Sequence, residues 1–236
     1  MKKVFKNIFP PFTWNGIFYL KAKVNKYLTS KRVILNKSLA DEKQQDLDIY
    51  WDPAFAIMLD EWGKDSVWNE IQLILANSRG KVLDIACGTG ITMKILKIFP
   101  KLDIYGFDIS ELMIESATAK GISKSKLMVS DATNTNYNDN EFDYSYSIGS
   151  LEHFTEDGIE KVIYESSRYT KTNSFHMIPV SRSGENMGWI KNLQSYFNNS
   201  EGWWYDKFKK YYSIVYIIPS KWEDNISKGR WFICVK

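Results

Sequence analysis

The stretch that decides the fold is 81-KVLDIACGTG-90. Residues 82–85 are mostly aliphatic, which is typical of a strand buried in a parallel sheet. Gly88 and Gly90 follow this strand directly, and glycines at such a place let another group come very close to the backbone. We therefore expect a buried strand that ends in a ligand-binding turn.

Strand-like and helix-like segments alternate around this turn, which indicates a parallel sheet covered by helices on both faces. The expected helices span 53–62, 66–77, 91–99, 111–120 and 156–170, and the expected strands span 102–108, 126–131, 142–148 and 174–178. The last two runs, 212–218 and 229–236, have no helix between them, so we expect an antiparallel pair at the sheet edge. The predicted fold class is α/β: a seven-stranded, doubly wound, Rossmann-like and mostly parallel sheet with an antiparallel edge strand.

The composition fits a packed domain with a decorated N-terminus. Hydrophobic residues make up 44% of the 236 residues, and no apolar run is long enough to span a membrane. The opening MKKVFKNIFPPFTW is basic like a signal peptide, but Lys6 and Pro10 interrupt its apolar part, so we expect no export. The two cysteines, Cys87 and Cys234, have no metal-like spacing. They favour a reducing cytoplasm and predict no metal site.

Charge is unevenly distributed along the chain. The first 40 residues hold nine basic and no acidic side chains, so the other 196 hold 22 basic and 28 acidic ones. This mildly acidic body argues against a nucleic-acid partner. Ile17, Leu20 and Val24 recur at helical spacing opposite Lys23 and Lys26, which predicts an amphipathic helix. The helix either lies on the domain or makes peripheral contact with an anionic membrane surface or partner.

We place a domain boundary at residue 80, with 1–79 as a basic helical arm and cap and 80–236 as the core. Within the core, about 179–212 is longer than an ordinary connection between strands. It is rich in aromatic residues, so we expect an insertion that covers the acceptor or that packs as a small core of its own. We expect Tyr50, Trp51 and the N-terminal helices to close the side of the site opposite this insertion.

The glycine turn does not match two common nucleotide-binding loops. A dinucleotide fingerprint needs a third glycine three positions after the second, where this chain has Met93. No Lys-Ser/Thr pair follows the turn, as a phosphate-binding loop requires. The turn therefore suits a ligand without a pyrophosphate.

An acidic residue stands at the end of each of three successive predicted strands: Asp84, Asp108 and Asp131. Ligands of open α/β sheets bind at the carboxyl ends of the strands, so these three side chains should meet at one site. A carboxylate at Asp108 can accept both hydroxyls of a ribose, and one at Asp131 can accept from the exocyclic amine of an adenine. The three acids predict a nucleoside ligand with a charged tail.

Four stretches, in this order and spacing, resemble the motifs of class I S-adenosylmethionine-dependent methyltransferases. They are 82-VLDIACGTG-90, 105-YGFDIS-110, 129-VSDAT-133 and 142-FDYSYSIGSLEHF-154, and the resemblance covers about residues 80–178. The last stretch is similar to the quinone-biosynthesis-like branch, which acts on small molecules. The resemblance implies S-adenosyl-L-methionine as the cofactor and S-adenosyl-L-homocysteine as its product.

The resemblance also implies which residues bind the cofactor. They are Asp84, Ala86, Gly88, Gly90, Asp108, Ile109, Asp131, Ala132 and Ser147. The Asp84 side chain and the backbone of Ala86, Gly88 and Gly90 would hold the methionine part. Asp108 would hold the ribose, and Asp131 with Ala132 would hold the adenine. Ala86 stands where many members of the family have another glycine.

Methyl transfer from a sulfonium needs alignment above all, and it needs a base only where the acceptor must lose a proton. The two histidines are the catalytic candidates, since His153 follows the fourth strand of the motif set and His176 lies inside the fifth. An orienting or structural role is the alternative for both, and it has more weight for His176. Glu152, Arg182 and Trp51 are candidate contacts of the acceptor.

The predicted function is methylation of a small molecule. Oxygen is the favoured acceptor atom, and nitrogen is the second choice. The Lys-, Asn- and Ile-rich composition resembles that of bacteria with AT-rich genomes, which suggests a sugar- or nucleotide-linked cell-envelope precursor. The stretch 147-SIGS-150 lacks the Asn/Asp-Pro-Pro-Tyr/Phe signature of nucleic-acid amino-group methylation. Protein or nucleic-acid methylation and a non-catalytic cofactor-binding module are the alternatives, and the oligomeric state is left open.

Overall fold

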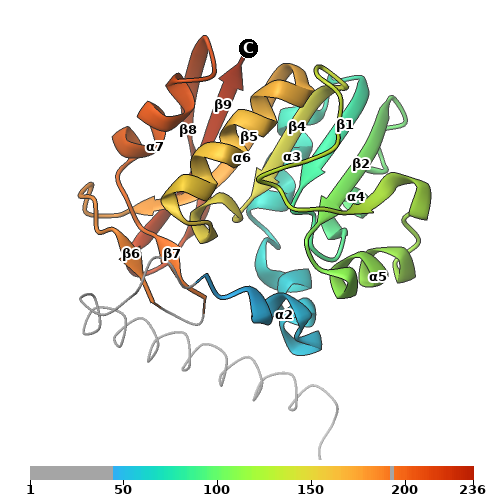
Figure 1. The fold of residues 1–236 in the computed structure, drawn as a ribbon, viewed down its shortest axis with the longest axis horizontal. Helices are drawn as coiled ribbons and strands as arrows, with labels where there is room; N and C mark the ends of the chain where they lie inside the picture. Colours follow the sequence, from blue (N-terminus) through green and yellow to red (C-terminus); the bar gives the residue numbers. More distant parts are fainter. Residues whose placement is uncertain (1–44, 192–193) are drawn as a thin grey trace, which may run out of the picture.

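The computed structural model describes residues 45–191 and 194–236, with a seven-stranded sheet at its centre (Figure 1). The strand order is β3-β2-β1-β4-β5-β9-β8. The strands are β1 Gly80–Ile85, β2 Leu102–Asp108, β3 Leu127–Val129, β4 Phe142–Ile148, β5 Thr170–Ser181, β8 Ile214–Glu223 and β9 Ser227–Val235. The predicted fold class is confirmed. The predicted amphipathic helix around residues 17–28 lies outside the described residues.

Helices cover both faces of this sheet. They are α3 Val67–Leu75, α4 Ile91–Leu96, α5 Glu111–Ala119, α6 Glu156–Tyr169 and α7 Glu201–Lys209, whereas α2 Pro53–Trp62 packs against α5. Leu83 and Ile85 of β1 belong to the core that includes α6 and α7, whereas Val82 belongs to the core that includes α3 and α4. Alternate residues of one central strand thus face opposite layers, which explains why Val82, Leu83 and Ile85 are all apolar.

The outer strands refine the predicted edge pair. β9 pairs antiparallel with β5 from Asn173 to Ser181, and β8 pairs antiparallel with β9 on its other side. The antiparallel strand β9 therefore lies one place inside the edge, and β8 is the outermost strand. Because β9 extends the pairing of β5, the fifth strand is longer than the predicted 174–178 and runs from Thr170 to Ser181.

The helix starts follow the local signals in the sequence. The Asp52 carboxylate accepts a hydrogen bond from the backbone N–H of Ala54 at 2.8 Å, and Pro53 is the first residue of α2. The Ser110 hydroxyl accepts one from the backbone N–H of Met113 at 3.3 Å at the start of α5. Both helices therefore begin at the residues expected from the sequence, 53 and 111.

Three short 3-10 helices, η2 Leu47–Trp51, η3 Lys124–Lys126 and η4 Leu151–His153, and a two-stranded sheet of β6 Trp189–Ile190 with β7 Tyr196–Phe197 complete the described chain. No helix within residues 45–191 and 194–236 is both long enough and apolar enough to cross a bilayer. In α7, Trp204 and Phe208 are fully buried in the same core as α6. The helical part of the predicted insertion therefore covers the sheet.

Candidate active site

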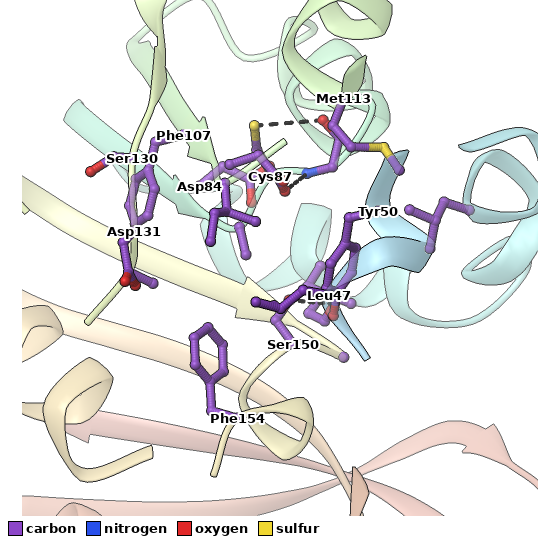
Figure 2. A pocket seen from close by; sticks show the side chains of 18 of the residues that line it. Leu47, Tyr50, Asp84, Cys87, Phe107, Met113, Ser130, Asp131, Ser150 and Phe154 are labelled. Carbon is purple, nitrogen blue, oxygen red and sulfur yellow. Dashed lines mark hydrogen bonds between the residues drawn. The ribbon is translucent and has the colours of Figure 1, made fainter. Parts of the chain in front are cut away.

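A cavity of about 360 Å³ lies at the carboxyl ends of β1, β2 and β4 (Figure 2). The chain order of the strands reverses between β1 and β4, and this is where ligands of open α/β sheets bind. Figure 2 shows Phe107, Ser130 and Asp131 on one side of the cavity and Leu47 and Tyr50 on the other. Both the predicted cofactor motifs and the segment before β1 thus contribute walls.

The glycine turn after β1 has the left-handed backbone conformation that its residue types favour. The φ angles of Ala86, Gly88 and Gly90 are 53°, 51° and 70°. Positive φ at Ala86 explains why a glycine is common at this place in the family that the motifs resemble. Ala86 and Gly88 line the cavity, whereas Gly90 starts α4 and packs against Ala117, where an added Cβ would lie 2.8 Å from the Ala117 Cβ.

Two buried carboxylates face the cavity from the ends of β1 and β2. Asp84 accepts a hydrogen bond from the Tyr146 hydroxyl at 2.8 Å. Asp108 accepts from the backbone N–H of Gly88 at 2.9 Å and of Ser110 at 3.0 Å. Burial raises the pKa of both carboxyls, and these hydrogen bonds oppose that rise. Asp108 is therefore held firmly in the cavity wall.

The turn after β3 carries the third predicted acid. Asp131 Oδ1 accepts from the backbone N–H of Thr133 at 2.8 Å and from its hydroxyl at 2.9 Å. Ser130, Asp131, Ala132 and Thr133 all line the cavity, as does Ile109 after β2. Seven of the nine predicted cofactor residues, Asp84, Ala86, Gly88, Asp108, Ile109, Asp131 and Ala132, are thus brought to one cavity.

The cavity is bordered by η2 and α2, as the sequence predicted for Tyr50, Trp51 and the N-terminal helices. Tyr50 lines the cavity, and its hydroxyl is hydrogen bonded to the side chain of Gln194, which lines it too. The backbone of Tyr50 is held as well, because the Ser110 hydroxyl donates to its carbonyl at 2.6 Å. The Trp51 indole donates to Glu111 at 3.0 Å, and Trp51 is not among the residues that line the cavity.

Several aromatic and aliphatic walls were not predicted. Phe55, Leu59, Trp62 and Trp68 come from α2 and α3, and Phe154 comes from the turn after β4. The proline-started helix at residue 53 was visible in the sequence, but the side of this helix that meets the cavity was not. The cavity is consequently more aromatic than the motif residues alone indicate.

Glu152 and His153 lie in η4, between the cavity-lining residues Ser150 and Phe154, but they do not line the cavity themselves. His153 Nδ1 is 2.9 Å from the backbone carbonyl oxygen of Ser195, so Nδ1 carries the proton and Nε2 is unprotonated in the neutral ring. Nε2 lies 3.6 Å from Glu152 Oε1, and Glu152 Oε2 is buried without a hydrogen bond. Burial raises the pKa of Glu152 to about 8 and lowers that of His153 to about 4.

The structure does not bring three other predicted residues to the cavity. His176 is fully buried, with Nδ1 2.8 Å from the Ser147 hydroxyl and Nε2 2.8 Å from the Ser174 hydroxyl. Its ring stacks on Phe208, and burial lowers its pKa to about 3. Ser147 and His176 are therefore partners in the core. Arg182 is 45% exposed and paired with Glu223 at 2.9 Å, and it does not line the cavity.

Residues 82–173 match the family model of the methyltransferase domain. Demethylmenaquinone methyltransferase of Thermotoga maritima is 39% identical over 85 residues, which are 35% of this chain and 37% of that protein. The tRNA (carboxymethyluridine(34)-5-O)-methyltransferase of Arabidopsis thaliana is 33% identical over 116 residues, 48% of this chain and 27% of that protein. The chain thus spans about a third of the length of these curated relatives.

Solved structures share the fold over most of the chain. The 1,6-didemethyltoxoflavin-N1-methyltransferase of Burkholderia thailandensis, solved with 1,6-didemethyltoxoflavin and S-adenosylhomocysteine, has a TM-score of 0.64 at 14% identity over 84% of this chain and 91% of that one. The PH0226 protein of Pyrococcus horikoshii has a TM-score of 0.58 at 19% identity, over 78% of this chain and 100% of that one.

Residues 82–173 are therefore similar to a methyltransferase domain, and the chain shares the fold of these solved structures, one of which is a methyltransferase with bound S-adenosylhomocysteine. The match to the demethylmenaquinone enzyme supports the resemblance to the quinone-biosynthesis-like branch. The residues present fit S-adenosylmethionine as the cofactor, since a buried carboxylate, a positive-φ turn and a second carboxylate border one cavity.

Proposed function

We propose that the protein transfers the methyl group of S-adenosylmethionine to a small-molecule acceptor, most readily to an oxygen and next to a nitrogen. The observation that carries this proposal is the wall that η2 and α2 add to the cavity. Leu47, Tyr50 and Trp62 face the ends of β1 and β4 from this segment. A reaction site walled in by side chains on this side suits a small acceptor better than a macromolecular one.

The cofactor supplies a methyl group that is already activated on a sulfonium, so the protein's part is to align the acceptor and to exclude water. Correct alignment alone is worth up to about 7–11 kcal/mol in rate. We assign the ribose to Asp108, the adenine to Asp131 and Ala132, and the methionine part to Asp84 and the backbone of Ala86 and Gly88. The aromatic walls from α2 would keep water away from the transferred group.

An acceptor hydroxyl must lose its proton as it is methylated. We propose His153 as the group that takes this proton through a bridging water, because its neutral ring has an unprotonated Nε2 and its turn lies between the cavity-lining residues Ser150 and Phe154, although the ring itself does not line the cavity. Glu152, the neighbouring buried carboxyl, does not line the cavity, so its role as an acceptor contact stays a prediction from the sequence. His176 is not part of the proposal, because both of its nitrogens are hydrogen bonded in the core.

The finer proposal concerns the acceptor. Tyr50, Phe55 and Trp62 favour a ring-bearing molecule, and a sugar- or nucleotide-linked cell-envelope precursor made in the cytoplasm is one such acceptor. The basic arm of residues 1–40 would bring the protein to a membrane surface on which such precursors are carried. Binding to acidic liposomes that survives deletion of residues 1–35 would contradict this role of the arm.

An RNA acceptor is the second candidate, because one curated relative acts on tRNA. The purified protein is incubated with methyl-labelled S-adenosylmethionine and a bacterial extract, and the label is separated by molecular size. Label in the small-molecule fraction, absent with Asp108→Ala, supports the proposal. Label in RNA that ribonuclease releases makes the second candidate the function, and label in protein contradicts both.

A further inference from the structure

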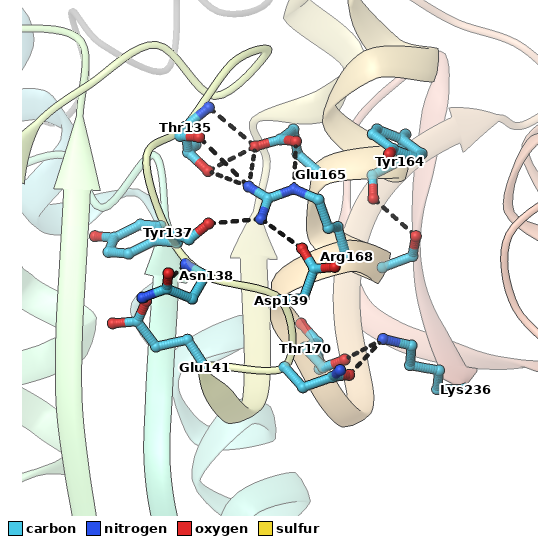
Figure 3. A network of polar contacts seen from close by, with 12 residues as sticks. Thr135, Tyr137, Asn138, Asp139, Glu141, Tyr164, Glu165, Arg168, Thr170 and Lys236 are labelled. Atoms are coloured by element: carbon cyan, nitrogen blue, oxygen red, sulfur yellow. Dashed lines mark hydrogen bonds and ion pairs between the residues drawn. The ribbon is translucent and has the colours of Figure 1, made fainter.

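The segment from Ser130 to Glu141, between β3 and β4, contains no helix or strand. Its first four residues line the cavity, and the remainder runs back along α6 (Figure 3). Such a segment lacks the hydrogen-bond ladder of a helix or a sheet, so its shape depends on its other contacts. The contacts that fix this segment therefore also set the shape of one end of the cavity.

Thr135 is the first residue after the cavity-lining turn that attaches the segment to α6. It is buried, and its backbone N–H and its hydroxyl both donate to Glu165 Oε2 on α6, at 2.9 and 2.6 Å. Only Asn134 separates Thr135 from Thr133, which fixes the Asp131 carboxylate through two hydrogen bonds. A displacement of Thr135 is thus transmitted to Asp131 across a very short stretch of backbone.

Arg168, three residues after Glu165 on α6, completes the arrangement. Its guanidinium makes a bidentate pair with Glu165, from Nε to Oε1 and from Nη2 to Oε2, both at 2.8 Å. Its Nη1 donates to the Tyr137 carbonyl at 2.5 Å and to Asp139 at 3.0 Å. Figure 3 shows the guanidinium between these partners. Its Nη2 also donates to the Thr135 carbonyl and hydroxyl, so one side chain holds the segment at Thr135, Tyr137 and Asp139.

Charge strengthens the group of contacts among Arg168, Glu165 and Thr135, which we call the clamp. Burial favours the neutral form of Glu165, but the hydrogen bonds from Arg168 and Thr135 outweigh burial, so its pKa is lowered. Charge-assisted bidentate pairs are stronger and more directional than neutral hydrogen bonds. The Tyr137 ring also packs edge-on against Phe142 and contacts Phe107, which lines the cavity.

We propose that Arg168, acting through Glu165 and Thr135, is a positioning residue that fixes the Asp131 turn and thereby sets the selectivity of the cavity for a purine with a 6-amino group. The inference rests on the proposed place of the adenine beside Asp131. An Asp131 carboxylate accepts a hydrogen bond from the 6-amino group of adenine, and it repels the 6-carbonyl oxygen of hypoxanthine. Selectivity between the two bases therefore depends on where Asp131 is held.

The test compares binding of S-adenosylhomocysteine and S-inosylhomocysteine to the full chain by calorimetry, without any acceptor. The wild type should prefer the adenine compound by about tenfold or more, as one charge-assisted hydrogen bond implies. In Arg168→Gln and in the milder Thr135→Val, affinity for S-adenosylhomocysteine should fall more than affinity for S-inosylhomocysteine. Thr135→Ser, which keeps the hydroxyl, should retain the wild-type ratio.

Ser166→Ala is the matched control, since Ser166 is buried on the same helix but hydrogen bonds to Ile163 and Tyr212, on the α7 side. It should lower stability and leave the affinity ratio unchanged. A ratio that stays constant in Thr135→Val overturns the proposal and leaves the clamp a structural role. Equal affinity of the wild type for both compounds overturns the proposal too, because the adenine would then not lie beside Asp131. Binding measured in this way does not depend on an acceptor, so failure of the proposed acceptor chemistry would appear separately.

Discussion

Asp108 at the end of β2 accepts a hydrogen bond from the backbone N–H of Gly88 in the turn after β1, at 2.9 Å. The second strand thus holds the glycine turn of the first, and its carboxylate is fixed before any ligand arrives. A carboxylate that is already oriented loses little freedom when it binds. This contact joins two of the sequence motifs into one binding surface.

The first prediction concerns the affinity for the cofactor. Asp108→Ala should weaken S-adenosylhomocysteine binding by one to a few powers of ten, since about 2–4 kcal/mol is lost with charge-assisted hydrogen bonds. Calorimetric titration measures the dissociation constant. Asp103→Asn is the matched control on the same strand, at a carboxylate that is 50% exposed and pairs with Lys126. An unchanged dissociation constant for Asp108→Ala would show that Asp108 does not bind the ribose.

The second prediction concerns the packing of the glycine turn. Gly90→Ala should lower the free energy of unfolding by about 2–4 kcal/mol, because it combines backbone strain with overpacking against Ala117. Urea denaturation measures the loss. Gly184→Ala isolates the backbone term, since Gly184 also has positive φ, at 79°, but no atom within 4 Å of an added Cβ. Equal losses in the two variants would show that contact with Ala117 is not limiting.

The third prediction concerns Ala86. Its φ of 53° is unfavourable for a residue with a Cβ, so Ala86→Gly relieves strain and increases the entropy of the unfolded chain. We expect a net stabilisation of about 0.5–1 kcal/mol in urea denaturation. Ala132→Gly, at a residue without positive φ, should destabilise instead. Loss of stability in Ala86→Gly would contradict the left-handed conformation of the turn.

The fourth prediction concerns pH. Burial raises the pKa of Glu152 from 4.5 to about 8, so the folded state keeps a proton that the unfolded state releases between these values. The contribution of Glu152 to stability is therefore largest at low pH and is lost as the pH rises through this window. Glu152→Gln should remove this loss. Its stability relative to wild type should rise with pH, by up to about 1.4 kcal/mol per pH unit, and level off above pH ~8.

Chemical denaturation at several pH values measures this difference. Glu61→Gln, at a carboxylate that is 72% exposed, is the control for adding a neutral side chain. A difference between Glu152→Gln and wild type that does not change with pH would show that Glu152 is ionised in the folded protein.

The half of the cavity that we assign to the cofactor was predictable because its residues stand at the ends of strands. Asp84, Asp108 and Asp131 follow apolar runs directly, and parallel strands bring such ends to one edge of the sheet. The bounds of β2 and β4 were predicted to the residue for the same reason, since turn residues border both runs. Local pattern sufficed wherever the site was made of consecutive strand ends.

The other half depends on contacts between distant segments, which local pattern does not contain. Tyr50 and Gln194 meet over the cavity although 144 residues separate them. His176 of β5 and Ser147 of β4 are register partners and face the core. Local pattern does not indicate that Phe208 of α7 covers this side of the strands. The orientation of a strand residue is decided by its partners, so both residues were expected at the site and lie away from it.

The domain boundary at residue 80 and the covering role of 179–212 stay predictions. Gln194 and the contact between the Ser195 backbone N–H and Asp46, at 2.7 Å, place part of this segment next to η2. The aromatic residues of α7, by contrast, fill the core between α6 and the sheet. Any covering function therefore falls to the part before α7.

A crystal structure of the protein with S-adenosylhomocysteine tests the central claim most directly. The account predicts the ligand in the cavity at the ends of β1, β2 and β4, with both ribose hydroxyls on the Asp108 carboxylate and the adenine amine beside Asp131. A ligand bound elsewhere, or a ribose that does not contact Asp108, would contradict it.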